Sequence, residues 1–265
     1  MREFPVESFI FAAKFLVMIP YWMSRTQLML DDEKVQALMG KNVLVVGLGG
    51  VGGICTEMIA RSGVGRMTLV DGDVVDPSNC NRQIVALHST IAKPKTEVLA
   101  DRLKDINPEI QLTVITDYLK DDKTTSLLDD GKFDYVVDCI DTLSPKVWLI
   151  KACVDRNIPV VSSLGAGGKV DPSQIKIADI SKSYNCTLAR YVRKYLRRVG
   201  IRKGVKVVFS PEEIDPSKVI ETEKAHPKKS IIGTISYMPA IFGCTVASVV
   251  IRDLYDAGSS PVSVI

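Results

Sequence analysis

Polar side chains that could bind a nucleoside triphosphate follow two apolar segments of the chain. Asn79, Arg82 and Lys95 come after the first segment, and Asp138 and Asp141 end the second. Cations neutralise phosphate oxygens, and a carboxylate such as that of Asp141 is a common Mg²⁺ ligand beside phosphates. A nicotinamide dinucleotide needs little beyond a glycine-rich turn, so the two additional cations and the acids favour ATP with Mg²⁺.

A glycine-rich turn precedes these residues and would supply further phosphate contacts. Residues 41–53 read KNVLVVGLGGVGG, a β-branched run followed by the pattern G-x-G-x-x-G. Glycines in such a turn allow backbone N–H groups to approach phosphate oxygens at the start of a helix. We expect nucleotide contacts from Gly47, Gly49, Gly50 and Gly52.

Two acids follow the next apolar run and would hold the ribose. Asp71 lies 24 residues after Gly47, where an acid can accept hydrogen bonds from ribose hydroxyls, and Asp73 follows closely. We expect both acids in the nucleotide site. The glycine turn and Asp71 are equally typical of an NAD dehydrogenase, so the preference for ATP depends on the cations.

Alternating strands and helices would position these groups at one edge of a sheet. We expect strands within residues 41–53, 67–71, 111–116, 133–141 and 158–165. We expect the intervening helices within residues 54–63, 93–110, 125–130 and 145–157. This alternation predicts βαβ units, and therefore an α/β, Rossmann-like fold with a mostly parallel sheet.

The C-terminal half departs from this alternation. The pattern predicts a hairpin-like antiparallel addition, a basic helix, a strand, a mobile polar loop, a strand and an apolar helix, at residues 165–180, 187–199, 206–210, 211–230, 231–239 and 240–254 respectively. The sequence has no internal repeats and no sign of a separate second domain. We therefore expect an N-terminal extension (1–23), a single domain (24–256) and a tail (257–265).

Composition and cysteine spacing narrow the class of protein. The chain has 265 residues, of which 46% are hydrophobic, and this is enough for one globular α/β domain. None of the six cysteines forms a C-x-x-C pair, so neither a zinc ribbon nor a thioredoxin-type motif is expected. We expect reduced thiols and no zinc.

The first part of the chain contains an apolar stretch. Residues 9–23 are interrupted by Lys14 and Pro20 and are shorter than the roughly 20 apolar residues of a membrane-spanning helix. They also lack the flanks of a signal peptide. We expect a helix that packs on the protein's own core or on a dimer partner, and the alternative is an anchor in the membrane interface.

A basic segment interrupts the otherwise balanced charge. Residues 181–210 carry nine lysines and arginines and no acid, in a chain whose net charge is only +3. This pattern is typical of a surface that binds a polyanion, although a solvated helix face has the same pattern. Helical spacing would direct Leu188, Val192, Tyr195 and Val199 inward.

Ordered motifs along the chain resemble those of a known superfamily. The chain carries, in order, GLGGVGG, LVDGDVVDPSNCNRQ, KPK and VVDCIDT. These are similar to motifs of ubiquitin-activating enzymes and of the bacterial MoeB and ThiF proteins, which bind ATP and adenylate a carboxylate. One branch fits better, the tRNA threonylcarbamoyladenosine dehydratases, which resemble this chain in RQIVALHSTIAKPK, DTLSPK, GAGGKVDPSQI and SYMPAIFG.

The resemblance implies a role for each candidate residue. The glycine turn would cradle the phosphates, Asp71 would hold the ribose, and Asn79 would orient the nucleotide. Arg82 and Lys95 would neutralise the phosphates, and Asp141 would bind Mg²⁺. The catalytic set that the resemblance implies is Arg82, Lys95, Asp141 and, from the second protomer of a homodimer, Arg25.

The resemblance also implies partners and a location. The substrate would be tRNA that carries threonylcarbamoyladenosine, and the residues expected to bind it are Arg190, Arg193, Lys194, Arg197, Arg198 and Arg202. Trp22 stands where MoeB proteins have another arginine, so the contact between protomers would depend on Arg25. A cysteine desulfurase or sulfur acceptor system is a further partner, and Cys186 is either a thioester-forming thiol or a spare one. Relatives occur in the bacterial cytoplasm and, in eukaryotes, at mitochondria. We therefore expect a cytoplasmic protein, and the alternative for a eukaryotic source is a mitochondrial one, with the outer membrane as a candidate site.

The reaction that the resemblance implies is an ATP-dependent cyclisation. Formation of an acyl-adenylate would turn a carboxylate into an electrophile, and a nitrogen of the same side chain would then close the ring. Because ring closure is intramolecular, the protein needs no nucleophile of its own. The alternatives are adenylation of the C-terminus of a ubiquitin-like sulfur carrier and a non-catalytic partner subunit.

Overall fold

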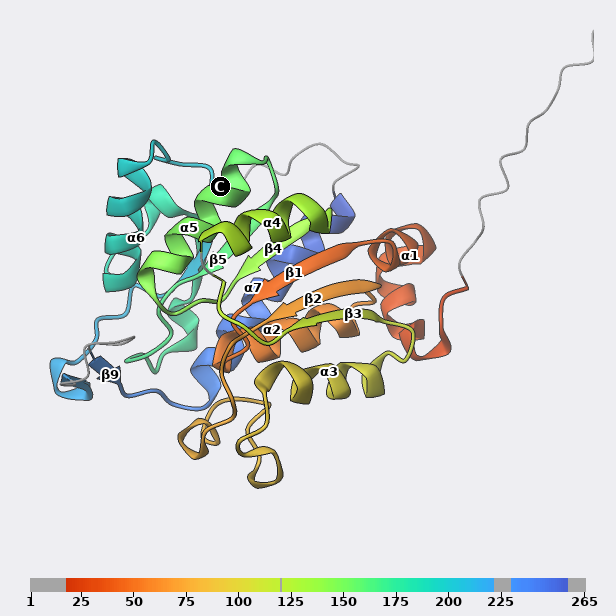
Figure 1. The fold of residues 1–265 in the computed structure, drawn as a ribbon, viewed down its shortest axis with the longest axis horizontal. Helices are drawn as coiled ribbons and strands as arrows, with labels where there is room; N and C mark the ends of the chain where they lie inside the picture. Colours follow the sequence, from red (N-terminus) through yellow and green to blue (C-terminus); the bar gives the residue numbers. More distant parts are fainter. Residues whose placement is uncertain (1–17, 120, 222–229, 257–265) are drawn as a thin grey trace, which may run out of the picture.

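A single twisted sheet organises the chain in the computed structural model, which describes residues 18–119, 121–221 and 230–256 (Figure 1). Its seven strands lie in the order β3-β2-β1-β4-β5-β7-β6. Their bounds are β1 Asn42–Val46, β2 Arg66–Val70, β3 Gln111–Ile115, β4 Tyr135–Asp138, β5 Val160–Ser163, β6 Lys176–Asp179 and β7 Lys206–Phe209. A separate antiparallel pair joins β8 (Val219–Glu221) to β9 (Ser230–Ile232).

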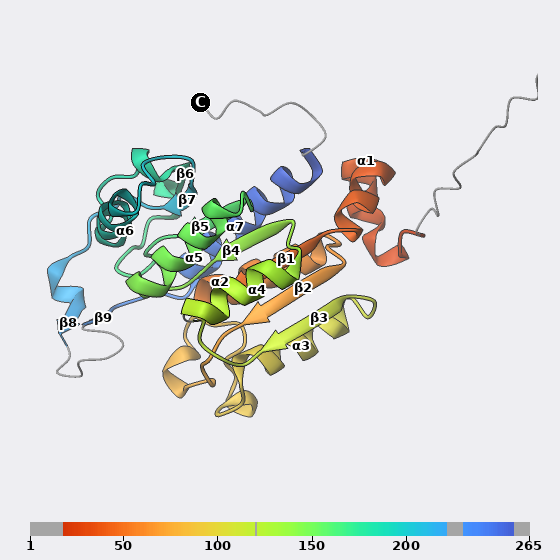
Figure 2. The same cartoon turned by 45° about the horizontal axis from the view of Figure 1, so that its top comes forward.

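Helices cover both faces of the sheet. They are α1 Ser24–Met39, α2 Gly50–Arg61, α3 Lys95–Ile106, α4 Asp121–Gly131, α5 Leu143–Asp155, α6 Thr187–Arg198 and α7 Tyr237–Asp256. Helices α2, α3 and α7 pack together on one face, and α4, α5 and α6 pack on the other. Figure 2 shows α1 and α6 at opposite ends of the molecule, as Figure 1 does.

The central strands are apolar because both of their faces are covered. Residues 43–46 of β1 and all four residues of β4 and of β5 are buried. Their side chains divide between two hydrophobic clusters, one under each helical layer. Continuous apolar strands of this kind are typical of a parallel sheet between helices, which confirms the predicted α/β fold.

The strand order reverses beside β1. This strand pairs in parallel with β2 on one side and with β4 on the other. The chain therefore crosses the sheet in one direction from β1 to β3 and in the other direction from β4 onward. In α/β folds, ligands bind at the carboxyl ends of the strands at such a reversal. The predicted phosphate-binding residues follow these strand ends.

The C-terminal half contains the predicted antiparallel addition, with two differences. Strand β6 pairs antiparallel with β7, as expected from the pattern. The predicted strand at 231–239 is wrong beyond Ile232, because Tyr237 begins α7. Pro239 fits the first turn of that helix, where a missing backbone N–H has no intrahelical acceptor to lose. The predicted loop at 211–230 contains the short strand β8, and residues 222–229 lie outside the described residues.

Helix α7 is the long apolar helix of the core. Among the described residues, it is the helix long and apolar enough to cross a membrane by length and composition, but half of its most apolar window is buried inside the protein. It packs closely on α2, since a Cβ added at Gly243 would lie 2.5 Å from the carbonyl oxygen of Val51. The burial identifies α7 as a core helix.

The predicted N-terminal helix lies mostly outside the described residues. The described chain reaches a short 3-10 turn at Tyr21–Met23 and then α1. Met23 is buried at the end of α2, where a Cβ added at Gly63 would lie 2.1 Å from its Cε atom. This contact fixes the start of α1 against the core.

Candidate functional site

The turn between β1 and α2 depends on glycine at two positions. Gly47 has φ +90°, and a Cβ there would lie 2.8 Å from the carbonyl oxygen of Cys139. A Cβ at Gly52 would lie 1.7 Å from the carbonyl oxygen of Gly47. Backbone atoms occupy both places, so a larger residue at either position would deform the turn.

The middle of the turn is crowded on one side and open on the other. A Cβ at Gly50 would lie 2.9 Å from the Cβ of Pro239 and 3.3 Å from the carbonyl oxygen of Arg82. A Cβ at Gly49 would meet its nearest neighbour, the Nε2 atom of Gln83, at 3.8 Å. Among the four glycines predicted to contact a nucleotide, Gly49 therefore has the most space beside it for a phosphate.

Asp71 connects the end of β2 to the glycine turn. Its Oδ2 atom accepts a hydrogen bond from the backbone N–H of Leu48 at 2.6 Å, and its Oδ1 atom accepts one from that of Asp73 at 2.8 Å. Burial raises the pKa of Asp71 above its usual value, and these two bonds oppose the rise. The carboxylate thus lies beside the turn, where a ribose would be expected.

Asp73 holds Lys95 at the start of α3. The Nζ atom of Lys95 donates to Oδ2 of Asp73 at 2.8 Å, and the lysine side chain is buried. The hydroxyl of Tyr118 donates to Oδ1 of the same carboxylate, which raises the pKa of Tyr118 to about 12. Lys95, the cation predicted to neutralise phosphates, is therefore positioned by Asp73, and both carboxylate oxygens of Asp73 accept hydrogen bonds.

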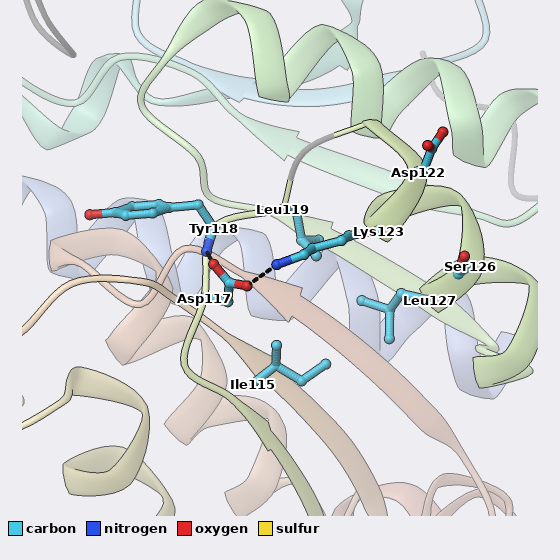
Figure 3. A pocket seen from close by; sticks show the side chains of 8 residues that line it. All are labelled: Ile115, Asp117, Tyr118, Leu119, Asp122, Lys123, Ser126 and Leu127. Atoms are coloured by element: carbon cyan, nitrogen blue, oxygen red, sulfur yellow. Dashed lines mark hydrogen bonds and ion pairs between the residues drawn. The ribbon is translucent and has the colours of Figure 1, made fainter.

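A cavity of about 340 Å³ lies beside Tyr118, between the end of β3 and α4. Its lining residues are Ile115, Asp117, Tyr118, Leu119, Asp122, Lys123, Ser126 and Leu127. Figure 3 shows the Tyr118 ring directed away from Leu127, while Asp117 and Lys123 form an ion pair at the cavity. The ring lies close over Gly72, where a Cβ would be 2.7 Å from the Cδ2 atom of Tyr118.

Asn79 and Arg82 both lie in the loop after β2. Asn79 is buried, and its Oδ1 atom accepts from the backbone N–H of Asp76 at 3.2 Å, which closes a short helical turn. Arg82 is half-buried, and its Nη1 atom donates to the carbonyl oxygen of Ser78 at 2.9 Å and to Oδ1 of Asn81 at 2.8 Å. Asn79 therefore stabilises the loop, and two oxygen atoms of the loop accept hydrogen bonds from the Nη1 atom of Arg82.

Asp138, the last residue of β4, and Asp141, shortly after it, have different environments. Asp138 is fully buried, and its Oδ2 atom contacts the Nζ atom of Lys146 at 2.7 Å and the hydroxyl of Ser162 at 2.6 Å. The charge of Asp138 is therefore balanced inside the protein. Asp141 lies at the surface, just before α5.

The described residues contain no group of three His, Cys, Asp or Glu side chains that could hold a metal ion by themselves. This arrangement still fits Mg²⁺, because that ion commonly uses one or two carboxylates and takes its other ligands from phosphates and water. Asp141 is the carboxylate at the strand ends that would serve this purpose.

Arg25 lies far from the nucleotide site of its own chain. It follows Met23, which contacts Gly63 just beyond the last turn of α2. The glycine turn is at the other end of this 12-residue helix, about 18 Å away at 1.5 Å per residue. The structure therefore does not bring Arg25 together with Lys95 and Arg82 within one chain.

Helix α6 presents most of its predicted basic residues to solvent. Its buried stripe consists of Ala189, Val192 and Leu196, so the expectation that Tyr195 and Val199 face inward is wrong. The exposed basic residues among those predicted to bind tRNA are Arg190, Lys194, Arg197, Arg198 and, beyond the helix, Arg202.

Arg193 differs from the other arginines of α6. It is half-buried and donates to the carbonyl oxygen of Ser183 at 2.6 Å. Burial and the neighbouring Arg197 lower its pKa. Its guanidinium thus has a partner within the fold.

Three polar residues near the strand ends were not predicted from the sequence. Tyr118 is exposed and lies three residues after the end of β3, and this position is the one signal that could have indicated it. Lys169 is 2% exposed and donates to the carbonyl oxygen of Glu212 at 2.5 Å, and burial lowers its pKa. Gln83 is buried beside Gly49, and its Oε1 atom has no hydrogen-bond partner among the described residues.

The comparisons with known proteins agree with this geometry. The ThiF family matches residues 24–263. The tRNA threonylcarbamoyladenosine dehydratase of Bacillus subtilis is 40% identical over 238 residues, which cover 87% of this chain and 93% of that protein. The enzyme of the same name from Escherichia coli is 39% identical over 190 residues, which cover 69% of this chain and 70% of that protein.

A solved structure of a relative in complex with ATP has the same fold as this chain. The Escherichia coli dehydratase TcdA in complex with ATP superposes with a TM-score of 0.81 at 32% identity, and the match covers 92% of this chain and 98% of that one. The family match, the identities over nearly whole chains and the shared fold all lead to one assignment. The chain belongs to the ThiF family, in the branch of the tRNA threonylcarbamoyladenosine dehydratases.

Proposed function

We propose that this protein is an ATP-dependent enzyme that dehydrates threonylcarbamoyladenosine in tRNA to its cyclic hydantoin form. The observation that carries the proposal is the meeting of three features at one edge of the sheet, namely the glycine turn, Asp71 and the Lys95 that Asp73 holds. Relatives named for this activity match most of the chain in sequence and in fold, which supports the proposal.

The nucleotide lies along the carboxyl ends of β2, β1 and β4. The ribose hydroxyls donate to Asp71, and the base occupies the side of the site where Tyr118 borders the cavity. The phosphates extend past Gly49, which has open space beside it, towards Arg82 and Lys95. Asp141 would hold Mg²⁺, which would supply further positive charge beside the phosphates.

The chemistry consists of two substitutions, the first at the α-phosphorus of ATP and the second at the carboxyl carbon of the modified adenosine. A carboxylate oxygen of the modified adenosine attacks the α-phosphorus of ATP, and pyrophosphate leaves. A nitrogen of the same side chain then attacks the acyl carbon and loses its proton, and AMP leaves with the former carboxylate oxygen. The protein contributes position and positive charge during both departures, so that Lys95 and Arg82 matter more than any nucleophile.

A homodimer completes each site with Arg25 of the second protomer. Two features support this proposal. Arg25 lies outside the reach of its own chain's site, and large apolar side chains around it face solvent in the single chain. These are Met18, Tyr21, Leu28 and Met29, each more than three-quarters exposed. Solvent-exposed apolar residues gathered around one helix are typical of a surface that another subunit covers.

The test is incubation of the purified protein with ATP, Mg²⁺ and tRNA that carries threonylcarbamoyladenosine, followed by mass measurement of the nucleoside. We expect loss of one water from the nucleoside and formation of AMP and pyrophosphate. The Lys95→Ala variant is the matched control. It should form none of these three products, while its melting temperature stays close to that of the wild type. Formation of AMP with a sulfur carrier protein, and not with the tRNA, would contradict the proposal.

A further inference from the structure

Two tyrosine rings lie on the solvent side of the basic helix α6. Tyr191 is 40% exposed and Tyr195 is 39% exposed, although the helix has a fully apolar stripe at Ala189, Val192 and Leu196 to bury such rings. Positions four residues apart are neighbours on one helical face. The two rings therefore lie on the same face of the helix, one turn apart.

Each ring carries a guanidinium group. The Cζ atom of Arg190 lies 5.1 Å from the ring centre of Tyr191, and that of Arg198 lies 4.9 Å from the ring centre of Tyr195. None of the ion pairs found in the described part of the chain includes an arginine of α6. Planar cations and rings thus share this surface without an acid to neutralise them.

The first turn of α6 begins at the edge of the sheet where the nucleotide site lies. A Cβ added at Gly165, just after β5, would lie 3.9 Å from the Cβ of Leu188. The ring of Tyr184, shortly before the helix, meets Phe209 at the end of β7 with 5.7 Å between ring centres. From this edge the helix runs towards the opposite end of the strands, where β7 begins.

We propose that this face of α6 is a stacking platform for unpaired RNA bases, formed by Tyr191 and Tyr195 with the guanidinium groups of Arg190 and Arg198. The inference rests on the proposed tRNA substrate and specifies which part of it α6 contacts. A duplex hides the faces of its bases and needs only cations at its phosphates. Exposed rings and planar cations match the unstacked bases of a single-stranded loop.

The platform has a direction. Tyr191 and Arg190 lie nearest the carboxyl edge of the sheet, so they contact bases close to the nucleotide that reacts. Arg197, and Arg202 beyond the helix, lie further away and contact phosphates of the adjoining stem. The loop that presents the modified adenosine would therefore cross the strand ends and lie along α6.

The experiment measures RNA binding alone, by fluorescence anisotropy, with an unmodified RNA hairpin and a blunt RNA duplex of equal length. We expect Tyr191→Ala and Tyr195→Ala each to weaken hairpin binding about fivefold or more, since stacking on one base is worth roughly this much. Binding of the duplex should change by less than about twofold. The Tyr191→Phe and Tyr195→Phe variants keep a ring and should bind the hairpin like the wild type.

Lys194→Ala is the matched control for charge. It should weaken hairpin and duplex equally and reduce the salt dependence of both. Equal losses for the two RNAs in the tyrosine variants, unchanged hairpin binding in them, or no hairpin binding by the wild type would each overturn the platform. Neither ATP nor the modified nucleoside is present, so an inactive dehydratase would leave this result standing, and loss of the platform would leave the dehydration chemistry untouched.

Discussion

Asp71 stabilises the fold and, in the proposed function, also binds the nucleotide. Its two carboxylate oxygens accept backbone N–H groups of Leu48 and Asp73, so the same group that would bind ribose also fixes the glycine turn against β2. Burial raises its pKa, and therefore the proton returns at a higher pH than it would on an exposed aspartate. We therefore expect the affinity for the nucleotide to fall when Asp71 becomes protonated.

Binding of ATP should weaken in acid because of Asp71. The ionised carboxylate is the stronger acceptor for a ribose hydroxyl, and it is lost as the pH falls through a pKa that lies above the usual value of about 4. We expect the ratio of the ATP dissociation constants of the Asp71→Asn variant and the wild type to be about tenfold at neutral pH and to shrink as the pH falls. Calorimetric titrations between pH 8 and pH 5 would measure it, and protonation of ATP affects both proteins equally. A ratio that does not change with pH would contradict the role of this carboxylate.

Elements of the fold are joined by a buried ion pair between Lys146 of α5 and Asp138 of β4. Both side chains are fully buried, and Lys146 also donates to the carbonyl oxygen of Ser163, the last residue of β5. One lysine therefore connects α5 with the ends of β4 and β5. Removal of one partner leaves the other as an uncompensated charge inside the protein.

The Lys146→Met variant should lower the free energy of unfolding by about 3–5 kcal/mol, since the Asp138 carboxylate then loses its cation. The double variant Lys146→Met with Asp138→Asn should recover most of this loss, because asparagine keeps neutral hydrogen-bonding groups near Ser162. Urea denaturation with an unchanged m-value would measure both. If the double variant were as unstable as the single one, packing rather than charge would explain the loss.

The sequence pattern predicted the elements better than it predicted their contacts. The glycine turn and the strand–helix alternation depend on neighbouring residues, and the structure has them where the pattern placed them. The inward stripe of α6 was predicted correctly at Leu188 and Val192 and wrongly at Tyr195 and Val199, because helical spacing relates residues to one another without saying which stripe meets the core. The pairing of Asp138 with Lys146 and the bond from Arg193 to Ser183 depend on how distant segments pack, and no local pattern reports that.

At the scale of the whole molecule, α1 and the nucleotide site are at opposite ends of α2. In the proposed dimer this separation is bridged by the neighbour, which brings its own Arg25 to the site. The proposal predicts that two inactive variants can restore activity to each other. Such a result would distinguish an arginine that acts between subunits from one that acts within a chain.

We expect Arg25→Ala and Lys95→Ala to be inactive when tested separately. When they are unfolded and refolded together in equal amounts, half of the dimers combine one chain of each kind, and each mixed dimer has one intact site. Activity should therefore return to about a quarter of that of the wild type. The nucleoside mass assay would measure it. No recovery, with mixed dimers shown to be present, would mean that Arg25 does not act between chains.

The contact between Met23 and Gly63 has a consequence that crosses the subunit boundary. Gly63 has φ +94°, and a Cβ there would lie 2.1 Å from the Cε atom of Met23, so an alanine would strain the backbone and displace the side chain that anchors the beginning of α1. In the proposed dimer, the nucleotide site of the variant subunit would stay intact. The site of the other subunit would lose the Arg25 that the variant should supply. In a proposed dimer of one wild-type and one Gly63→Ala subunit, the inactive site would therefore be that of the wild-type subunit.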